Sequence, residues 1–268
     1  DLRSILSADV ADFNNDGLID IVGIGYRRNG GAAVTYPEAN VVLLNRGGGR
    51  FEVTHFLSDD YVTAYGQKKQ KYHFECGQVQ AYDFNNDGYV DFFVNANSND
   101  RSVLGTTNGS STHFSEIFLN DPEHPGQFRR LNIGSMGIPA MSEGGVAIAD
   151  YNNDGLPDFF FSGWTGNGRQ QYVWRVYQAS LGTDGSLKYT SRGNSGLPEM
   201  RNQNSTATQY GAMDWDGDGN FDIFNLGWST RESMQTCFIS LGTGTGSFKE
   251  SARMGGGSEG CVAFIDWN

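Results

Sequence analysis

Hydrophobic residues in this chain fall into short runs, and none of the runs has the spacing of an amphipathic helix. In each recurring unit a stretch of small residues precedes an acidic segment, and a dense apolar run such as Phe159–Phe161 follows it. Two more strand-like segments complete the unit, for example Trp174–Tyr177 and, in another unit, Phe128–Ile133. Short apolar runs bounded by turn residues are typical of strands buried on both faces. Each unit therefore predicts four antiparallel strands joined by turns.

This unit occurs four times. The acidic segments start at Asp12, Asp83, Asp150 and Asp214, which are 71, 67 and 64 residues apart, and a truncated copy starts 52 residues later at Asp266. Sheets repeated at such a period stack around an axis, because one sheet alone cannot bury both of its faces. The sequence therefore predicts an all-β fold in which residues 1–268 form one β-propeller segment. Its four-stranded antiparallel blades are expected at about 7–57, 76–134, 143–191 and 209–255, with the first strand of a fifth blade within 259–268.

Composition and charge reduce the number of functional classes to which this chain can belong. The 37 glycines against six prolines are consistent with many tight turns. A net charge of −12 argues against a nucleic-acid partner, and no apolar run is long enough for a membrane-spanning helix. Thirteen of the 31 acidic residues lie in the four acidic segments. Acidic residues gathered at fixed spacing indicate metal ligation rather than a solvating surface.

The four acidic loops follow the pattern D-x-[DN]-x-D-G-x-x-D, and we number their positions from 1 to 9. Positions 1, 3, 5 and 9 supply side-chain oxygens, position 7 supplies a backbone carbonyl, and the glycine at position 6 allows a sharp turn. An all-oxygen donor set in a flexible loop favours Ca²⁺ over Mg²⁺, so we expect about four Ca²⁺ sites. The expected ligands are Asp12, Asn14, Asp16, Leu18 and Asp20; Asp83, Asn85, Asp87, Tyr89 and Asp91; Asp150, Asn152, Asp154, Leu156 and Asp158; and Asp214, Asp216, Asp218, Asn220 and Asp222.

Two other interpretations of these loops exist. They could be Asx-rich turns without a metal, although three or four carboxylates in nine residues repel one another unless a cation neutralises them. They could also be EF-hand loops, but position 12 holds Gly23, Val94, Phe161 or Asn225 and never the bidentate glutamate. Four Ca²⁺ ions would reduce the net charge from −12 to −4, so calcium is expected to stabilise the fold.

These loops resemble the FG-GAP/VCBS repeat family, whose best-known members are the calcium-binding propellers of integrin α-subunits. The resemblance covers nearly the whole chain and is strongest at the acidic loops, whereas no Phe-Gly…Gly-Ala-Pro signature precedes them. Propellers of this family usually have about seven blades. The resemblance therefore implies that this chain is part of a larger ring, and it implies a secreted or cell-surface location.

The longer connections between predicted strands lie on the face opposite the acidic loops, where a ligand site is expected. Fourteen residues after the start of three acidic loops stand Tyr26, Trp164 and Trp228, with Arg27 and Arg169 nearby. These side chains could stack on a sugar and donate hydrogen bonds to it, or the rings could simply pack between blades. The aromatic residues at loop position 2 are expected to pack between blades; they are Phe13, Phe84, Tyr151, Trp215 and Trp267.

The pattern as a whole favours an extracellular binding or adhesion module with a carbohydrate or protein ligand. No nucleophile or zinc signature accompanies the four histidines, so an enzyme is not favoured. A polysaccharide-lyase-like enzyme remains an alternative, and its best candidate residue is His73 beside Lys71. A structural role within a larger surface assembly is a further alternative.

Overall fold

The computed structural model describes residues 5–25, 27–29, 32–34, 40–56, 74–98, 113–141, 144–165, 171–198, 200–201, 209–229 and 234–255. It confirms the predicted fold class: the chain is all-β, with four-stranded antiparallel sheets of the propeller-blade type. Within the described ranges the helical content is a single 3₁₀ turn, η2 (Ile133–Met136). The chain forms two compact units, of which the first contains blades 1 and 2 and the second contains blades 3 and 4.

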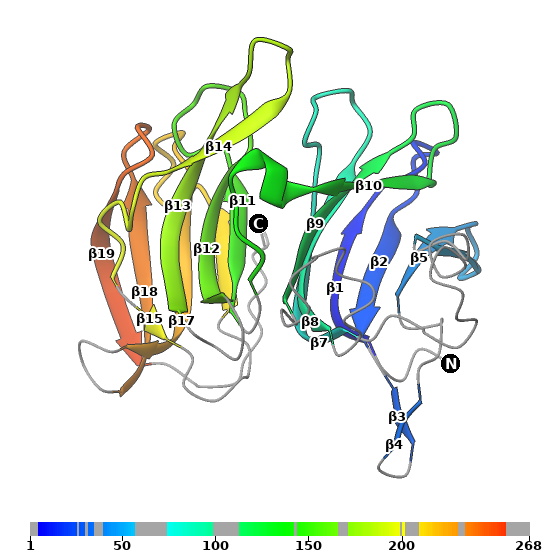
Figure 1. Cartoon of the computed structure of the whole chain (residues 1–268), viewed down its shortest axis with the longest axis horizontal. Coiled ribbons are helices and arrows are strands. Elements are labelled where there is room, and N and C mark those ends of the chain that lie inside the picture. The colour runs from blue at the N-terminus through cyan, green and yellow to red at the C-terminus, as the bar shows by residue number, and fades with distance from the viewer. Residues whose placement is uncertain are drawn as a thin grey trace. The chain divides into compact units, whose positions relative to one another are not determined.

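The first unit contains two sheets whose strands run in chain order across each blade (Figure 1). Blade 1 consists of β1 (Ile5–Ala11), β2 (Asp20–Gly25), β5 (Val41–Asn45) and β6 (Phe51–His55). A separate two-stranded hairpin, β3 (Arg27–Asn29) and β4 (Ala32–Val34), is inserted between β2 and β5. Blade 2 consists of β7 (Phe74–Tyr82), β8 (Asp91–Ser98), β9 (His113–Asn120) and β10 (Phe128–Asn132).

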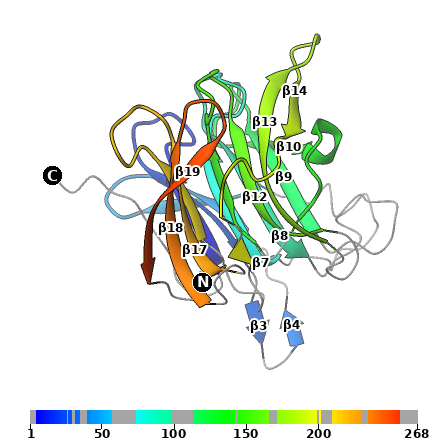
Figure 2. The ribbon, with the colours of Figure 1, turned by 90° about the vertical axis from the view of Figure 1, so that its left-hand side faces the viewer.

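The second unit repeats the same meander. Blade 3 consists of β11 (Val146–Ala149), β12 (Asp158–Thr165), β13 (Gln171–Leu181) and β14 (Leu187–Ser191). Blade 4 consists of β16 (Gln209–Met213), β17 (Asp222–Ser229), β18 (Met234–Gly242) and β19 (Phe248–Gly255). The short strand β15 (Met200–Arg201) pairs with the end of β17 beyond β16. Figure 2 shows β17, β18 and β19 side by side.

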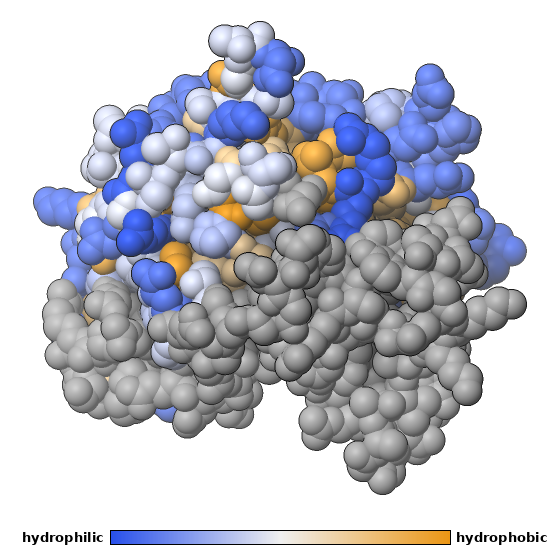
Figure 3. All heavy atoms as spheres, in the orientation of Figure 1, coloured by the Kyte–Doolittle hydropathy of each residue, from blue (hydrophilic) through white to orange (hydrophobic). Residues whose placement is uncertain are grey.

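A core of buried apolar side chains lies between the blades within each unit. In the first unit Phe56, Phe92 and Phe118 form a cluster with ring centroids 4.9–5.0 Å apart, and Val22 and Val42 of blade 1 pack in the same core. The second unit has an equivalent aromatic cluster in its core, formed by Phe160, Trp174 and Tyr210. Burying rings of this size supplies most of the favourable free energy that holds neighbouring blades together. On the face drawn in Figure 3, small hydrophobic areas lie among hydrophilic residues.

The first strand of a blade has small residues because its neighbours come very close. A Cβ atom on Gly77 of β7 would lie 2.9 Å from Cδ1 of Ile24 in blade 1 and 2.9 Å from Cβ of Ala96. A Cβ atom on Gly144, just before β11, would lie 1.9 Å from the carbonyl oxygen of Ser162. Neither distance is compatible with a real side chain, so glycine is required where these strands approach.

Candidate functional site

Each acidic loop connects the first strand of its blade to the second. The loops follow β1, β7, β11 and β16, and position 9 of each loop is the first residue of β2, β8, β12 or β17. The strands hold the two ends of the loop in antiparallel register, as Ala11 pairs with Asp20 in blade 1. Each loop is therefore a tight connection whose two ends are fixed by paired strands.

The carboxylates at positions 1 and 5 are turned inward by the loop's own backbone amides. In the loop of blade 3, the Asp150 carboxylate accepts hydrogen bonds from the amides of Asp154 (3.0 Å) and Gly155 (2.7 Å), and Asp154 accepts one from Leu156 (2.9 Å). The same three bonds recur in the other three loops, at 2.7–3.2 Å. The same backbone amides therefore hold the carboxylates of positions 1 and 5 in every blade.

Backbone conformation in the loop explains two residue choices. The glycine at position 6 has a φ of 84–87° in all four loops. A residue with a Cβ atom would be strained at this φ, although no neighbouring atom lies within 4 Å of the Cβ position. Position 4 also adopts the left-handed conformation, with φ of 53° at Asn15, 55° at Asn86 and 59° at Asn153. Asparagine tolerates this region better than most residues, and in the fourth loop glycine (Gly217, φ 76°) replaces it.

The aspartate at position 9 fastens the loop to the sheet. In blade 1 the buried Asp20 accepts hydrogen bonds from the amide of Phe13 (2.9 Å), at loop position 2, and from the amide of Asn45 (2.7 Å), at the end of β5. The equivalent pairs of bonds are 2.7–3.1 Å long at the other three aspartates, which are Asp91, Asp158 and Asp222. Position 9 therefore joins the beginning of the loop to the third strand of its own blade, a role that the loop pattern alone did not indicate.

Burial and neighbouring charge make these aspartates weak acids. Burial disfavours the charged form and raises the pKa of Asp91 and of Asp158 to about 7. The two amide hydrogen bonds lower the pKa, and the negative charges of the carboxylates at positions 1 and 5 raise it further. The pKa of Asp20 is raised for the same reasons, and that of Asp222 is raised by burial and by the carboxylates at positions 3 and 5. Each loop therefore concentrates negative charge that a bound cation would relieve.

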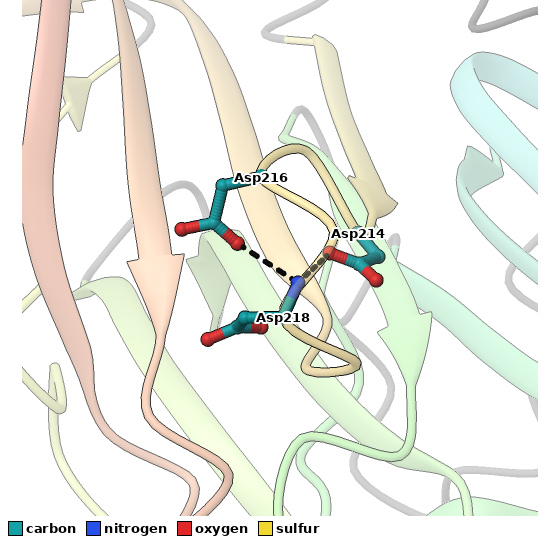
Figure 4. A group of neighbouring side chains, drawn as sticks. All are labelled: Asp214, Asp216 and Asp218. Carbon is teal, nitrogen blue, oxygen red and sulfur yellow. Dashed lines mark hydrogen bonds between the residues drawn. The ribbon is translucent and has the colours of Figure 1, made fainter.

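The donor set fits a hard divalent cation. In blade 4, Asp214, Asp216 and Asp218 each offer a carboxylate oxygen, and these atoms lie within 4.8 Å of one another (Figure 4). The amide of Asp218 donates to both Asp214 (3.1 Å) and Asp216 (3.3 Å), which fixes the arrangement. In the other loops position 3 is asparagine, and its Oδ1 accepts the same amide bond at 3.1–3.3 Å. Carboxylate and amide oxygens at this spacing match the ligands that Ca²⁺ prefers.

Comparison with protein families gives a direct match. The FG-GAP-like repeat matches residues 12–94 and 83–161, which together make up more than half of the chain, and both matches include acidic loops. The chain belongs to the FG-GAP-like repeat family.

No curated protein matches this FG-GAP-like chain. One matching solved structure is a lectin from Agrocybe aegerita, described as recognising non-reducing terminal N-acetylglucosamine. The similarity covers 95% of this chain and 53% of the lectin chain, with 16% identity and a TM-score of 0.45. This chain therefore spans about half the length of that structure, and a similarity at this level does not identify a ligand.

An arginine lies beside the first FG-GAP-like loop. Nη1 of Arg46 is 3.5 Å from Oδ2 of Asp16, and Arg46 also pairs with Glu52 at 2.9 Å. Arg46 follows β5 directly, so the turn between the third and fourth strands brings it next to the acidic loop. Among the ion pairs of the described residues, this is the one that reaches an expected metal ligand, and sequence reasoning did not predict it.

Position 4 also connects neighbouring loops. In the first unit Nδ2 of Asn15 donates to the carbonyl oxygen of Gly88 in the loop of blade 2, at 3.2 Å. In the second unit Nδ2 of Asn153 donates to Oδ1 of Asn220 in the loop of blade 4, at 2.8 Å. Sequence reasoning missed this role, although the recurrence of asparagine at a position with no ligand function was a usable signal.

The expected ligand-binding aromatic residues are only partly described. Trp164, near the end of β12 remote from the acidic loop, is half-buried, and its ring meets that of Tyr172 edge to face at 5.2 Å. Arg27 lies in β3 and Trp228 in β17, but their side chains are outside the described part of the structure, as are Tyr26 and Arg169 entirely. His73 and Lys71, the candidate enzyme residues, and residues 259–268 also lie outside the described ranges. Within those ranges, no helix is long and apolar enough to cross a membrane.

Proposed function

We propose that the four acidic loops bind Ca²⁺ and that this chain is an extracellular binding module whose blades calcium stabilises. The observation that carries the proposal is the amide network shared by all four loops, which in blade 4 holds carboxylate oxygens of positions 1, 3 and 5 within 4.8 Å of one another. A bound Ca²⁺ would supply positive charge to neutralise these carboxylates. Turns that served only the backbone would not need a third acidic side chain such as Asp216.

The cation type follows from the donors. Each loop offers carboxylate and amide oxygens from the partly or fully exposed positions 1, 3 and 5 and the backbone carbonyl of position 7, with no nitrogen or sulfur ligand. Magnesium demands a nearly ideal octahedron and keeps several of its waters, whereas calcium accepts larger and less regular oxygen shells. Exposed loops of this kind suit the millimolar calcium outside cells better than the low calcium of cytosol, which supports an extracellular location.

Calcium binding is tested by following thermal unfolding of the whole chain in EDTA, in Ca²⁺ and in Mg²⁺. We expect Ca²⁺ to raise the melting temperature strongly and Mg²⁺ to raise it little, because only binding to the folded state stabilises. The variant Asp216→Asn should weaken one site, with Asp184→Asn, an exposed aspartate outside the acidic loops, as the control. Identical melting in EDTA and in millimolar Ca²⁺ would contradict the proposal.

The ligand site is proposed at the strand ends remote from the acidic loops. Trp164 and Tyr172 are partly exposed there on adjacent strands, β12 and β13, and form an edge-to-face pair. A partly exposed aromatic pair at the rim of a rigid sheet can stack on the apolar face of a sugar ring or receive an apolar side chain. The buried Asp158 ties the acidic loop of blade 3 to β13, so β12 and β13 are joined at the other end of the same sheet and would present the pair without further ordering.

A screen of immobilised glycans and proteins, run with and without chelator, would identify the ligand class. We expect Trp164→Ala to remove binding while leaving the calcium-dependent melting temperature nearly unchanged. The control is Leu181→Ala, an exposed apolar residue at the other end of β13. If Trp164→Ala retained full binding of a ligand that the chain recognises, the ligand site would lie elsewhere.

A further inference from the structure

One layer of the core in the second unit is polar where the first unit is apolar. In the first unit, Ile24 of blade 1 lies in the apolar core with Val79, Val94 and Phe118 of blade 2. Counted from the start of each acidic loop and through the strand registers, the equivalent residues of blades 3 and 4 are Ser162, Tyr210, Asn225 and Ser240. We call these four residues the polar layer. All of them are buried, with at most 4% of each residue exposed.

The protein satisfies only part of the polar layer. Oγ of Ser162 in blade 3 donates to the hydroxyl oxygen of Tyr210 in blade 4 at 3.0 Å. Asn225 is 0% exposed, yet neither its Nδ2 nor its Oδ1 has a hydrogen-bond partner among the described residues. The same holds for Oγ of Ser240 and for Nε1 of Trp174, which stands opposite Ser162 on β13. Buried polar groups are nearly always hydrogen-bonded, because an unpaired group keeps the full cost of its desolvation. The four unpaired atoms therefore indicate a partner outside the described residues.

The polar layer lies next to the aromatic pair of the proposed ligand site. Trp164 follows Ser162 by two residues on β12, so both side chains are on the same face of the sheet, and Tyr172 pairs with Trp164 across to β13. On β17 the next position of the inner face beyond Asn225 is Gly227. Glycine has no side chain, so β17 leaves the next level toward the strand end uncovered, while the half-buried Trp164 stands at the corresponding position of blade 3.

The chemistry of the polar layer favours an uncharged partner. The layer contains hydroxyl and carboxamide groups, and Trp174 adds an indole N–H, but none of these groups is charged. A carboxylate or phosphate bound here would lose its hydration without gaining a cation. The net charge of −12 on the whole chain also disfavours an anionic ligand.

The number of unpaired groups favours a sugar over an amino-acid side chain. The carboxamide of Asn225 both donates and accepts hydrogen bonds, and a hydroxyl group does the same. A sugar carries several hydroxyl groups on one ring and so can bond to Asn225 and to Trp174 together, whereas one polar side chain of a peptide brings a single group. The apolar face of the same ring suits contact with Trp164 and Tyr172.

We propose that the polar layer is the inner part of the ligand site and binds hydroxyl groups of an uncharged sugar. The ring of Trp164 turns aside as the sugar enters, and the sugar hydroxyls bond to Asn225 and to Nε1 of Trp174. This inference rests on the proposed ligand site at the same strand ends, and it adds the class of ligand and the residues that select it. It does not depend on calcium binding by the acidic loops.

The test follows the indole N–H resonance of Trp174 by NMR, assigned by its loss in Trp174→Phe. The probes are glucose, galactose, mannose and N-acetylglucosamine, with glucuronate as a charged sugar and capped glutamine as a peptide side chain. At least one uncharged sugar should shift this resonance in a saturable way. Glucuronate and capped glutamine should each bind about tenfold more weakly or worse, because they leave buried groups unpaired or bury a charge.

The variant Asn225→Val tests the layer itself, because valine is the residue at the equivalent position of blade 2. It should weaken sugar binding about tenfold or more, since the hydrogen bonds of the carboxamide are lost. Its melting temperature should be unchanged or higher, because the substitution removes two unpaired buried polar atoms. Ser251→Val, at an exposed position of β19 in the same blade, should leave sugar binding unchanged.

The variant Trp164→Ala separates this inference from the proposed ligand site. If Trp164→Ala abolished sugar binding and Asn225→Val did not, the site at the strand ends would stand and the role of the polar layer would be wrong. If only Asn225→Val abolished it, the polar layer would stand and the aromatic pair would not be part of the site. The inference would also be overturned if no uncharged sugar shifted the Trp174 resonance, or if capped glutamine alone did. No sugar response together with a lower melting temperature of Asn225→Val would mean that the layer holds ordered water only.

Discussion

Oδ1 of Asp158 accepts a hydrogen bond from the backbone amide of Ala179, and the two atoms are 2.7 Å apart. Asp158 begins β12 and Ala179 lies near the end of β13, while the other carboxylate oxygen of Asp158 accepts the amide of Tyr151 in the loop. One buried side chain thus ties an acidic loop to the strand beyond it. The position-9 aspartate has a structural task whether or not a cation is bound.

This task can be separated from metal binding. In EDTA, Asp158→Asn should lower the free energy of unfolding by about 1–3 kcal/mol, because an amide group can accept only one of the two backbone bonds and turns a buried N–H₂ toward the other donor. Asp154→Asn, at the exposed position 5 of the same loop, should change stability in EDTA by less than about 0.5 kcal/mol.

Urea unfolding in EDTA followed by calcium titration would measure both effects. Both variants should bind Ca²⁺ more weakly in blade 3, since each removes a carboxylate from the expected site. Equal stability losses in EDTA would mean that position 9 is no more structural than position 5.

Another carboxylate, that of Asp9, joins two neighbouring blades. Asp9 in β1 accepts hydrogen bonds from the amide of Ala81 in blade 2 (2.7 Å) and from that of Val10 (2.9 Å), and burial raises its pKa although both bonds lower it. Because the pKa is higher in the folded chain than in the unfolded chain, folding favours the neutral form. The stabilisation from Asp9 is therefore greatest at low pH and is lost as the pH rises through the folded pKa.

The variant Asp9→Asn, which cannot titrate, isolates this effect. We expect the stability of wild type relative to Asp9→Asn to increase as the pH falls from about 8 to about 4, measured in EDTA so that calcium does not contribute. A constant difference, or one that decreases on acidification, would show that burial does not govern this carboxylate.

The sequence was sufficient for the fold class and for the left-handed turn at the glycine of position 6, and physical reasons explain why. Alternating turn glycines and apolar runs define strands locally, and the aspartates of a loop act within nine residues of one another. The bond from Asn15 to Gly88 joins residues 73 positions apart and depends on how blades stack, which no local pattern specifies. Trp215 and Tyr151 are equivalent in sequence, yet one is exposed and the other buried, because burial depends on the following blade.

Arg46 should compete with a cation at the first loop. Its guanidinium lies 3.5 Å from the Asp16 carboxylate in a partly exposed position, where an ion pair contributes about 0.2–1 kcal/mol. We therefore expect Arg46→Gln to increase the calcium affinity of this loop about two- to fivefold, an effect that high salt should reduce.

Amide resonances report each loop separately in an NMR calcium titration. The titration midpoint of Gly17 should shift to lower calcium in Arg46→Gln, while that of Gly155 in blade 3 should not move. A second variant, Arg253→Gln, removes an exposed arginine that pairs with Glu250 and should leave both midpoints unchanged. An unchanged Gly17 midpoint would mean that Arg46 does not act on the site.

Asn153 combines a backbone role and a side-chain role, and two substitutions separate them. Its φ of 59° is unfavourable for most residues, and its Nδ2 donates to Asn220 in the neighbouring loop at 2.8 Å. Asn153→Gly keeps the backbone conformation and loses the bond, which should cost about 0.5–1.5 kcal/mol of unfolding free energy. Asn153→Ala loses the bond and adds about 1–2 kcal/mol of left-handed strain. Urea unfolding should therefore rank wild type above the glycine variant and the glycine variant above the alanine variant. If glycine matched wild type, the bond between the two loops would contribute nothing; if alanine matched glycine, the left-handed conformation would not constrain this position.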